Sequence, residues 1–498
     1  MFAQIKKVLI ANRSEIAARI IQTCKSLGIQ TVAVYAPEDA TAPYVYAADQ
    51  AVALELSGSA GYLDANLLVS IALQTNCNAV HPGYGFLSEK EYFATAVTNA
   101  GLIWIGPKAQ TIERAGNKSA AHNFAKQLGV PVIVGASFIS NQTKEAFAYA
   151  SKLNFPIVLK CALGGGGKAM RIVHTSQTFH ELWELVVRES LRFFNADQIL
   201  LEKYIPKARH IEIQIAGDGT DIIHLFEREC SLQRRNQKII EEAPCNFVPQ
   251  ATLKQLYAAS IKLGEALNYN NVGTIEFLVT PENNFYFLEI NTRLQVEHAV
   301  TELITGIDIV WLQFYLAEYK KLPFTQEQIT HRGHAIQARI YAEDCEQNFM
   351  PSSGTLHIAQ FANHPFARID HNLEAGTKIT PLFDPMIAKV IGWGATREFA
   401  RKNLDTVLQQ SSLFNISTNI KFLSALLHSI NFIEGDIYTA LLSNKKFLES
   451  LIDQLKIKPE NNSELESLCR QLAKEFTKLQ PQTSQAPTHN GWKKQSWK

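Results

Sequence analysis

The sequence FYFLEINTRLQVEH, residues 285–298, joins a predicted strand to a run of polar and charged residues. Side chains alternate between the two faces of a strand, so every second residue shares a face. We expect one face of this strand to carry Phe285, Phe287, Glu289 and Asn291. A carboxylate and an amide then project together from the end of the strand.

A second predicted strand precedes this one. Residues 274–279, TIEFLV, have strand composition, and the short segment Thr280–Asn284 contains proline and asparagine, so the two strands predict a hairpin. The hairpin places Glu276 opposite Glu289. Two carboxylates and the Asn291 amide form a hard oxygen donor set, which suits Mg²⁺ because that ion takes few carboxylates and leaves its other positions to water and phosphates. The donor set therefore predicts a site for magnesium and a nucleotide.

Three polar residues continue the alternation beyond the strand: Arg293, Gln295 and Glu297. In an extended chain they face the same side as the metal ligands. A planar guanidinium suits an anion shaped like a carboxylate, and a neighbouring carboxylate can remove a proton. A solvated charged loop is the simpler interpretation of any one of these residues. It does not account for three polar residues on the face of two ligands, so we favour an anion site with a base.

The composition indicates a large globular protein in a reducing compartment. The chain has 498 residues, 46% of them hydrophobic, which is enough for about three domains with buried cores. A net charge of +1 is not the excess of positive charge that is typical of nucleic-acid-binding proteins. The seven cysteines form no C-x-x-C pair, and no apolar run is long enough for a signal sequence or a membrane span. We therefore predict a cytoplasmic protein without nucleic-acid or membrane partners.

The N-terminal segment predicts a doubly wound α/β layer. Residues 8–11 and 30–35 have strand character, and apolar residues between them recur at helical spacing until Gly28. A dinucleotide site is not indicated, because the G-x-G-x-x-G motif is absent. The motif HPGYGFLSE, residues 81–89, comes after a further strand, at the sheet edge where ligands bind in open α/β sheets. Taken alone, this motif would be interpreted as an ordinary turn.

Four consecutive glycines, Gly164–Gly167, lie between two predicted strands, with Lys160 and Lys168 on either side. A hairpin needs only two turn residues, so the extra glycines indicate backbone close to a ligand, with amides free for phosphate oxygens. A flexible linker is the alternative, and the closely flanking strands disfavour it. The P-loop motif G-x-x-x-x-G-K-[ST] is absent. We predict a flap over a triphosphate.

A charged run occupies residues 227–238, ERECSLQRRNQK. Such a run is usually a solvated surface. Because apolar strand residues precede it and Pro244 terminates the apolar segment on its C-terminal side, we interpret it as a loop that offers cations to an anionic substrate. A later alternating segment places Ala335, Gln337 and Arg339 on one face, which is an unusual composition for a core strand.

These segments occur in the order and spacing of biotin carboxylase, an ATP-grasp enzyme, and the resemblance covers residues 6–447. The motifs that carry it are IANR at 10–13, HPGYGFLSE at 81–89, the four glycines, EKY at 202–204, CSLQRRNQK at 230–238, EINTRLQVEH at 289–298 and Arg339. Within that family the chain most resembles the biotin-carboxylase part of acetyl-, propionyl- or methylcrotonyl-CoA carboxylase α chains.

The resemblance implies an α/β fold class with an ATP-grasp fold between two further domains. The expected boundaries are a doubly wound, Rossmann-like N-terminal domain at 1–114, an ATP-grasp domain at 115–318 with a glycine-rich lid at about 131–205, an α+β C-terminal domain at 319–447, and a polar tail at 448–498. Within the tail, apolar residues between Leu465 and Leu479 form one stripe and predict an amphipathic helix.

The resemblance also implies a ligase reaction in two stages. ATP phosphorylates bicarbonate to carboxyphosphate, and the carboxyl group then passes to N1 of biotin on a carrier protein. Mg²⁺ or Mn²⁺, as two ions, assists the nucleotide. Bicarbonate and biotin come from the resemblance alone, whereas the residues themselves indicate a metal, a nucleotide, an anion site and a base.

The matching positions imply the roles of individual residues. The phosphates would be held by Lys118, Lys160, Gly165 and Gly166. The adenine would be bordered by Glu202, Lys203, Tyr204 and Ile205, with further nucleotide contacts from His210, Gln233 and Asn236. The metal ligands would be Glu276, Glu289 and Asn291. Bicarbonate would be bound by Lys238, Arg293, Gln295 and Val296, Glu297 would deprotonate it, and Arg339 would bind biotin and stabilise its enolate.

The biotin must arrive on another polypeptide, because the Met-Lys-Met attachment motif is absent. The resemblance therefore implies a biotin carboxyl carrier protein and carboxyltransferase subunits as partners, and a homodimer. The ending NGWKK, residues 490–494, resembles the start of the next domain of longer α chains, which suggests a truncated product.

Two alternatives stay open. The first is an ATP-grasp ligase that activates another carboxylate, which the array of Arg293, Gln295 and Glu297 disfavours. The second is a decayed paralogue that binds nucleotide or partner subunits without catalysis. Four departures from the family pattern motivate the second alternative: Ser14 and Ala169 replace glycines, Asn236 replaces a histidine, and Ala299 replaces a proline. No departure removes a metal ligand, the base or the anion-binding arginine, and Ala169 can stiffen the flap because alanine is strained at positive φ.

The first prediction concerns Asn236, which keeps hydrogen-bonding capacity but lacks the cationic form of histidine. We expect slowed rather than abolished turnover in the natural sequence, so Asn236→His should raise the rate of ATP hydrolysis severalfold. A steady-state phosphate-release assay on both proteins measures the difference. An unchanged or lower rate would contradict the interpretation.

Overall fold

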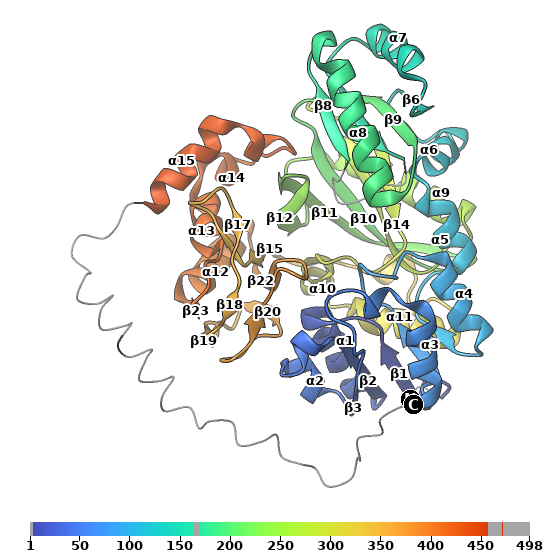
Figure 1. The fold of residues 1–498 in the computed structure, drawn as a ribbon, viewed down its shortest axis with the longest axis vertical. Helices are drawn as coiled ribbons and strands as arrows, with labels where there is room; N and C mark the ends of the chain where they lie inside the picture. Colours follow the sequence, from blue (N-terminus) through green and yellow to red (C-terminus); the bar gives the residue numbers. More distant parts are fainter. Residues whose placement is uncertain (1–2, 163–168, 457–470, 472–498) are drawn as a thin grey trace.

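The computed structural model describes residues 3–162, 169–456 and 471 (Figure 1). Gly165 and Gly166 lie outside these residues, as does the predicted tail helix apart from residue 471. Among the described residues no single helix is long and apolar enough to cross a membrane. The bent pair α10 (His298–Thr305) and α11 (Ile309–Tyr319) passes that test only when the two helices are taken together, by length and composition.

The N-terminal part is a parallel five-stranded sheet in the order β3-β2-β1-β4-β5, which confirms the predicted doubly wound layer. Its strands are β1 (Lys7–Ile10), β2 (Gln30–Tyr35), β3 (Gln50–Ala53), β4 (Ala79–His81) and β5 (Ile103–Trp104). Its longer helices are α1 (Ser14–Leu27), α3 (Ala65–Gln74), α4 (Glu91–Asn99) and α5 (Ala109–Gly116). Helix α1 buries Ile16, Ile20 and Cys24 against the sheet, as the helical spacing predicted.

The centre of the molecule is an eight-stranded sheet in the order β14-β13-β10-β11-β12-β15-β22-β20, with every neighbouring pair antiparallel. Five strands come from the middle of the chain: β10 (Arg209–Asp218), β11 (Ile222–Arg234), β12 (Gln237–Ala243), β13 (Asn270–Val279) and β14 (Phe285–Asn291). Three come from the C-terminal part: β15 (His334–Tyr341), β20 (Ala367–His371) and β22 (Met386–Gly394). The sheet thus continues across the expected boundary at 318, and the domain boundaries stay predictions.

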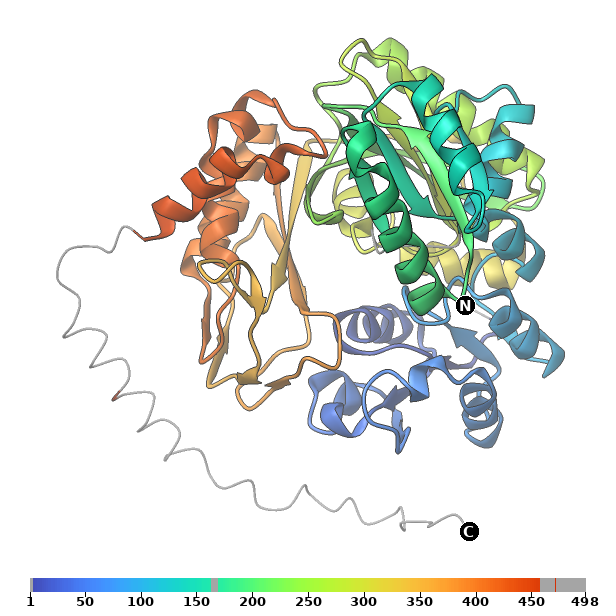
Figure 2. The same cartoon turned by 45° about the horizontal axis from the view of Figure 1, so that its top comes forward.

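A separate four-stranded sheet, β6-β9-β7-β8, stands above the central sheet in Figure 1 and occupies the range expected for the lid. It consists of β6 (Gly135–Ile139), β7 (Ile157–Cys161), β8 (Met170–Val173) and β9 (Gln198–Lys203), covered by α7 (Thr143–Leu153) and α8 (Phe179–Phe194). Helix α6 (Lys118–Gln127) precedes the lid, and α9 (Gln250–Ala266) packs on β10 and β11. Figure 2 shows the N-terminal part, in blue, below the lid and beside the C-terminal strands.

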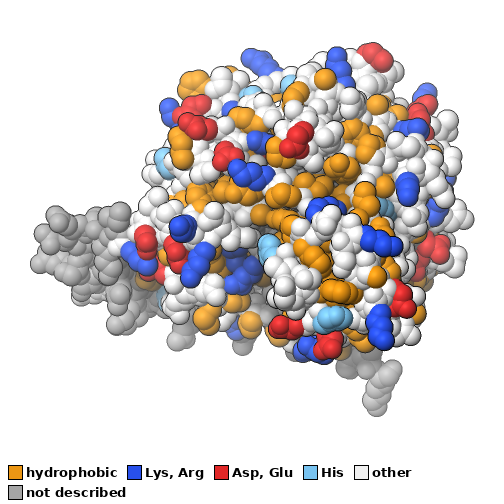
Figure 3. All heavy atoms as spheres, turned by 90° about the horizontal axis from the view of Figure 1, so that it is seen from above, with side chains coloured by type: hydrophobic (Ala, Val, Ile, Leu, Met, Phe, Trp, Pro, Cys, Tyr) orange, Lys and Arg blue, Asp and Glu red, His pale blue; other side chains and the backbone are white. Residues whose placement is uncertain are grey.

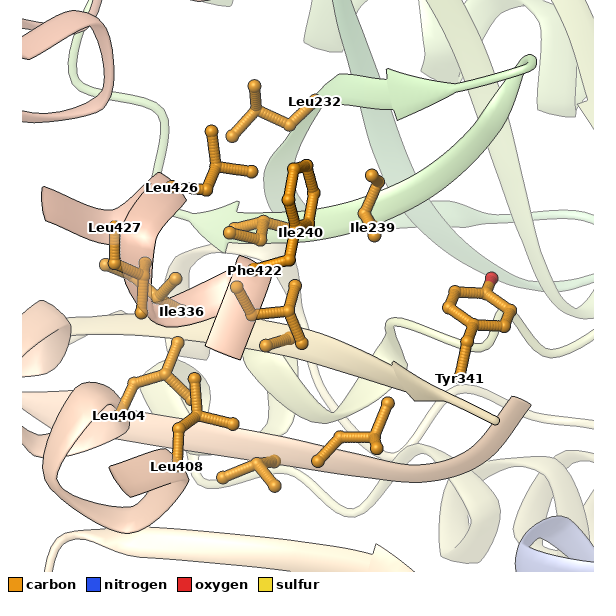
Figure 4. Packing of buried hydrophobic residues seen from close by; sticks show 14 of the residues in the cluster. Leu232, Ile239, Ile240, Ile336, Tyr341, Leu404, Leu408, Phe422, Leu426 and Leu427 are labelled. Atoms are coloured by element: carbon orange, nitrogen blue, oxygen red, sulfur yellow. The ribbon is translucent and has the colours of Figure 1, made fainter. Parts of the chain in front are cut away.

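The C-terminal part packs helices α12 (Arg397–Gln410), α13 (Ile420–His428), α14 (Ile430–Glu434) and α15 (Lys445–Leu455) around one hydrophobic core. In Figure 4, Leu404 and Leu408 of α12 and Phe422 of α13 lie over the strands that carry Ile240 and Ile336. The core side of β15 is therefore apolar, which leaves its other side for polar groups. On the surface in Figure 3, positive and negative side chains are interspersed, in keeping with the net charge of +1.

The interpretation of residues 227–238 as a loop is wrong. They form most of the hairpin of β11 and β12, whose turn contains Arg235 and Asn236 at φ values of 52° and 63°. The largely buried arginines of this segment are neutralised by carboxylates on other strands: Arg228 bonds Glu212, and Arg234 bonds Glu343. A charged segment therefore forms a core strand when its counter-charges lie on neighbouring strands.

The hairpin of β13 and β14 is confirmed, with Thr280–Asn284 as its loop and Glu276 opposite Glu289. The prediction that side chains alternate strictly between the two faces of the strand from Phe285 to Asn291 is wrong. Glu276 pairs with Glu289, but the next residue, Phe277, pairs with Phe287. Leu288 is therefore an extra residue in β14, a β-bulge. Phe285 and Phe287 consequently pack in the core, whereas Glu289 and Asn291 face a cavity.

Ser14 is the position that carries the second prediction. It begins α1 with a φ of 58°, a left-handed conformation that costs a side chain about 1–2 kcal/mol. We expect Ser14→Gly to raise the free energy of unfolding by roughly 0.5–1 kcal/mol, because glycine relieves the strain at some cost in unfolded-state entropy. Urea unfolding followed by circular dichroism provides the measurement. Ser26→Gly, late in the same helix, should lower stability by roughly 0.5 kcal/mol; the same sign for both variants would refute the assignment of strain.

Candidate active site

All parts of the described chain meet around one cavity of about 1000 Å³. The N-terminal part contributes Asn12–Ile16 and Tyr84–Phe86, and the C-terminal part contributes Leu382–Met386. The predicted site residues that line the cavity are Lys118, Lys160, Glu202, Lys203, Tyr204, Ile205, His210, Gln233, Asn236, Lys238, Glu276, Glu289, Asn291, Arg293, Gln295, Val296 and Arg339. Glu297 is fully buried behind the wall and connects to the cavity through its partners. Residues from distant strands thus converge as the sequence predicted.

Lys238 lies at the centre of the site. Its Nζ atom is 2.6 Å from Glu212, 2.9 Å from Glu276 and 2.7 Å from Glu297. Burial alone would lower the pKa of Lys238, but these three carboxylates raise it well above its ordinary value. The ammonium group is therefore a permanent positive charge in the wall of the cavity.

Glu276 is the carboxylate on which most donors converge. Its Oε1 atom accepts hydrogen bonds from Lys238, Asn291 at 2.8 Å and Gln295 at 3.0 Å. His210 Nε2 lies 2.7 Å from the other oxygen, and its Nδ1 is 2.8 Å from the Gln233 amide nitrogen, which favours a proton on Nε2. Burial would raise the pKa of Glu276, but Lys238 and His210 lower it well below its ordinary value. It is therefore ionised, as a metal ligand must be.

Two lysine–carboxylate pairs lie at the nucleotide end predicted from the sequence. Lys118 Nζ is 2.7 Å from Glu289, and Lys160 Nζ is 2.6 Å from Glu202. Burial would raise the pKa of Glu289, but Lys118 lowers it. Both ammonium groups can turn to a polyphosphate, and Glu289 is then free to bind a divalent cation. Glu276, Glu289 and the Asn291 amide supply hard oxygen donors on adjacent strands, so the donor set fits Mg²⁺ or Mn²⁺.

Arg293 is held at the anion end by neighbours on its own segment and by the N-terminal part. Its guanidinium donates to Gln295 Oε1 at 2.8 Å and to Asn291 Oδ1 at 3.1 Å. Its Nε atom lies 3.2 Å from Glu89, the last residue of the HPGYGFLSE motif. The guanidinium therefore lies in the cavity wall, next to the predicted metal ligands.

Glu297 sits at the turn that begins α10, and two cations from other strands bind it. Lys238 is 2.7 Å from Oε1, and Arg339 is 2.9 Å from Oε2. Burial would raise the pKa of Glu297, but these cations lower it below its ordinary range. Arg339 is in turn fixed by Glu241 at 2.5 Å. The predicted base is thus ionised, oriented and shielded from water.

Sequence reasoning missed three charged residues behind the site: Glu212, Arg228 and Glu241. All three are fully buried; Glu212 joins Arg228 to Lys238, and Glu241 joins Gln337 to Arg339. A signal was available, because His210, Glu212 and Gln214 alternate on one face of a strand whose other face is isoleucine. Their partners are 14 to 98 residues away in the sequence, so the sequence alone could not show which charges pair.

Similarity to known proteins agrees with this geometry. Three family models match consecutive segments: biotin carboxylase, N-terminal domain, at 4–112; carbamoyl-phosphate synthase L chain, ATP binding domain, at 117–325; and biotin carboxylase C-terminal domain at 337–444. A protein named biotin carboxylase from Halalkalibacterium halodurans is 42% identical over 441 residues, 88% of this chain and 97% of the relative. The methylcrotonoyl-CoA carboxylase subunit alpha of Glycine max is 42% identical over 446 residues, which are 89% of this chain but 61% of the relative.

Solved structures show the same fold. The biotin carboxylase domain dimer of Hydrogenobacter thermophilus 2-oxoglutarate carboxylase, in complex with MgADP, ADP and bicarbonate, has a TM-score of 0.87 at 38% identity, covering 90% of this chain and 99% of that one. Campylobacter jejuni biotin carboxylase, in a β-γ-ATP complex, has a TM-score of 0.85 at 35% identity, covering 88% and 98%. The fold and site therefore define an ATP-grasp enzyme. More narrowly, the chain belongs to the biotin carboxylase family.

The third prediction tests the buried charge network. Arg228 is fully buried and donates to Glu212, Gln214, Thr274 and Thr301. We expect Arg228→Met to lower the free energy of unfolding by about 3–5 kcal/mol, because it leaves carboxylate and hydroxyl acceptors without their donor. Urea unfolding measures the loss.

The control is Arg188→Met on α8, where an exposed arginine lies 3.7 Å from an exposed glutamate. This substitution should change stability by no more than about 0.5 kcal/mol. Equal effects of the two variants would show that the Arg228 network does not stabilise the fold.

Proposed function

We propose that the protein uses ATP to carboxylate biotin, with bicarbonate as the carboxyl donor and biotin presented on a carrier protein. The observation that carries this proposal is one cavity with paired carboxylates and phosphate-binding lysines at one end and Lys238, Arg293 and Arg339 at the other. Glu297 lies directly behind that end, bonded to Lys238 and Arg339. The Hydrogenobacter thermophilus relative, in complex with MgADP and bicarbonate, supports the same two ligands here.

At the nucleotide end, Lys118 and Lys160 bind phosphate oxygens, together with the backbone at Gly165 and Gly166. The segment from Glu202 to Ile205 borders the adenine, and His210, Gln233 and Asn236 complete the contacts. Glu276, Glu289 and Asn291 hold Mg²⁺ or Mn²⁺, which neutralises phosphate charge when bound. The chain's own contribution is to hold the phosphates in line with the anion site.

At the anion end, Arg293, Gln295, Lys238 and the Val296 backbone bind bicarbonate. Glu297 takes its proton, the carbonate oxygen attacks the γ-phosphorus, and ADP leaves, which yields carboxyphosphate. The low pKa of Glu297 makes it a weak base while Lys238 and Arg339 bind it fully. When bicarbonate also binds Lys238, its negative charge offsets part of the positive charge near Glu297. The pKa of Glu297 therefore rises as the substrate binds. Carboxyphosphate then breaks down to carbon dioxide and phosphate, and the phosphate takes the N1 proton of biotin. Arg339 stabilises the enolate that results, and N1 of the enolate attacks the carbon dioxide to give carboxybiotin.

The biotin carboxyl carrier protein, the carboxyltransferase and the acyl-CoA substrate belong to the proposal for the whole enzyme. The chain spans about three fifths of the methylcrotonoyl-CoA relatives, at 61% of their length. A homodimer is supported by the dimer in the Hydrogenobacter thermophilus structure. We propose a cytoplasmic location, although the methylcrotonoyl-CoA relatives are mitochondrial by name.

The fourth prediction tests the reaction and its base together. Phosphate release from MgATP should rise when both bicarbonate and free biotin are added. Glu297→Gln should lower that stimulated rate by about 100-fold or more, since general-base catalysis contributes about 10²–10⁴-fold. Binding of MgATP, measured by calorimetry, should stay within a few-fold of wild type.

Glu449→Gln, an exposed residue on α15, is the matched control and should leave the rate unchanged. Stimulation by a different carboxylic acid, without effect of bicarbonate, would favour the alternative ligase. Nucleotide binding without any stimulated turnover would favour the decayed paralogue.

A further inference from the structure

Lys389 is a lysine in the interior of strand β22, and none of its surface is exposed. Its Nζ atom donates to the backbone carbonyl of Val296 at 3.0 Å and lies 3.2 Å from Glu15 and 3.5 Å from Asp370. The group thus joins α1 of the N-terminal part, β20 and β22 of the C-terminal part, and the segment that carries the base. None of the proposed nucleotide, metal, bicarbonate or biotin contacts involves it.

A buried ammonium group is destabilising unless its partners are well placed. Glu15 is 3% exposed, and the ammonium group of Lys389, at 3.2 Å, is its closest cation. Among the described residues, no other group donates a hydrogen bond to its two buried carboxylate oxygens. Burial raises the pKa of Glu15 to about 7 although Lys389 opposes the shift. An apolar pair would fill this space with less desolvation, which points to a positional role for the charge.

The Val296 carbonyl belongs to the peptide group that leads into Glu297. This peptide is planar and trans, so fixing the carbonyl also fixes the Glu297 N–H in the opposite direction. Helix α10 begins at the next residue and packs on β15 and β22, while α1 packs on β20 and β22. Lys238 and Arg339 hold the side chain of Glu297, and Lys389 holds its backbone.

We propose that Lys389, held between Glu15 and Asp370, is a positioning residue that sets the Glu297 carboxylate for proton removal from bicarbonate. This inference rests on the proposed function. Because its partners come from three parts of the chain, the base is in place only when those parts are docked. Lys118 and Lys160 pair with other carboxylates at the nucleotide end, so ATP binding does not depend on Lys389.

The test is the double variant Glu15→Gln with Lys389→Met, which removes the lysine together with its nearest carboxylate. Asp370 keeps its two contacts with Arg368, at 2.7 Å each, so no carboxylate in the cluster loses its only cation. We expect kcat for bicarbonate-dependent biotin carboxylation to fall at least about tenfold, because a displaced base loses alignment. The KM for ATP should stay within twofold.

The matched control is Lys402→Met on α12, an exposed lysine at 63%, which should leave both constants unchanged. Hydrogen exchange supplies a readout independent of activity: the amides of Glu297 and His298 should exchange faster in the double variant. Unchanged kcat and exchange would overturn the inference, as would a loss of kcat matched by the same loss of folded protein and of ATP affinity. If wild type shows no bicarbonate-stimulated turnover, the proposed function fails, and the exchange rates alone decide the positioning role.

Discussion

The contact of the Lys238 ammonium with Glu212, Glu276 and Glu297 is the interaction on which the rest of the site depends. Three carboxylates this close are unstable without compensating charge, because each raises the pKa of the others. Lys238 supplies that charge at the point where the carboxylates from β10, β13 and the α10 turn converge. Arg228 adds positive charge from behind the site, and Arg339 adds it from the cavity wall.

This requirement explains why the central sheet runs across two expected domains. Glu212 lies on β10, Lys238 and Glu241 on β12, and Arg339 on β15, so the charges alternate across strands that are adjacent or nearly so. Hydrogen bonds between strands fix their spacing far more tightly than flexible side chains could. A rigid sheet thus presents ionised groups at set positions, and reorganisation at the moment of reaction is small.

The sequence predicted those elements whose signal is local. The hairpin that pairs Glu276 with Glu289 is predicted by two strands and a short loop, and alternation predicted the polar face of Arg339. The β-bulge at Leu288 could not be predicted from the sequence, because a bulge depends on what the partner strand packs against. The charged strand at 227–238 was misread for the same reason: Arg234 finds Glu343 only through the tertiary fold. Bicarbonate and biotin came from family resemblance.

The strained start of α1 takes its meaning from the residue beside it. Ser14 adopts a positive φ, and the next residue is Glu15, whose carboxylate meets Lys389 across the boundary between the N-terminal and C-terminal parts. The turn at Ser14 sets the direction in which α1 begins, and so where Glu15 points. Strain of this kind persists only where surrounding contacts determine the conformation. The glycine usual at this position in the family would reach the same turn without strain, so the geometry, rather than the serine, is what the site requires.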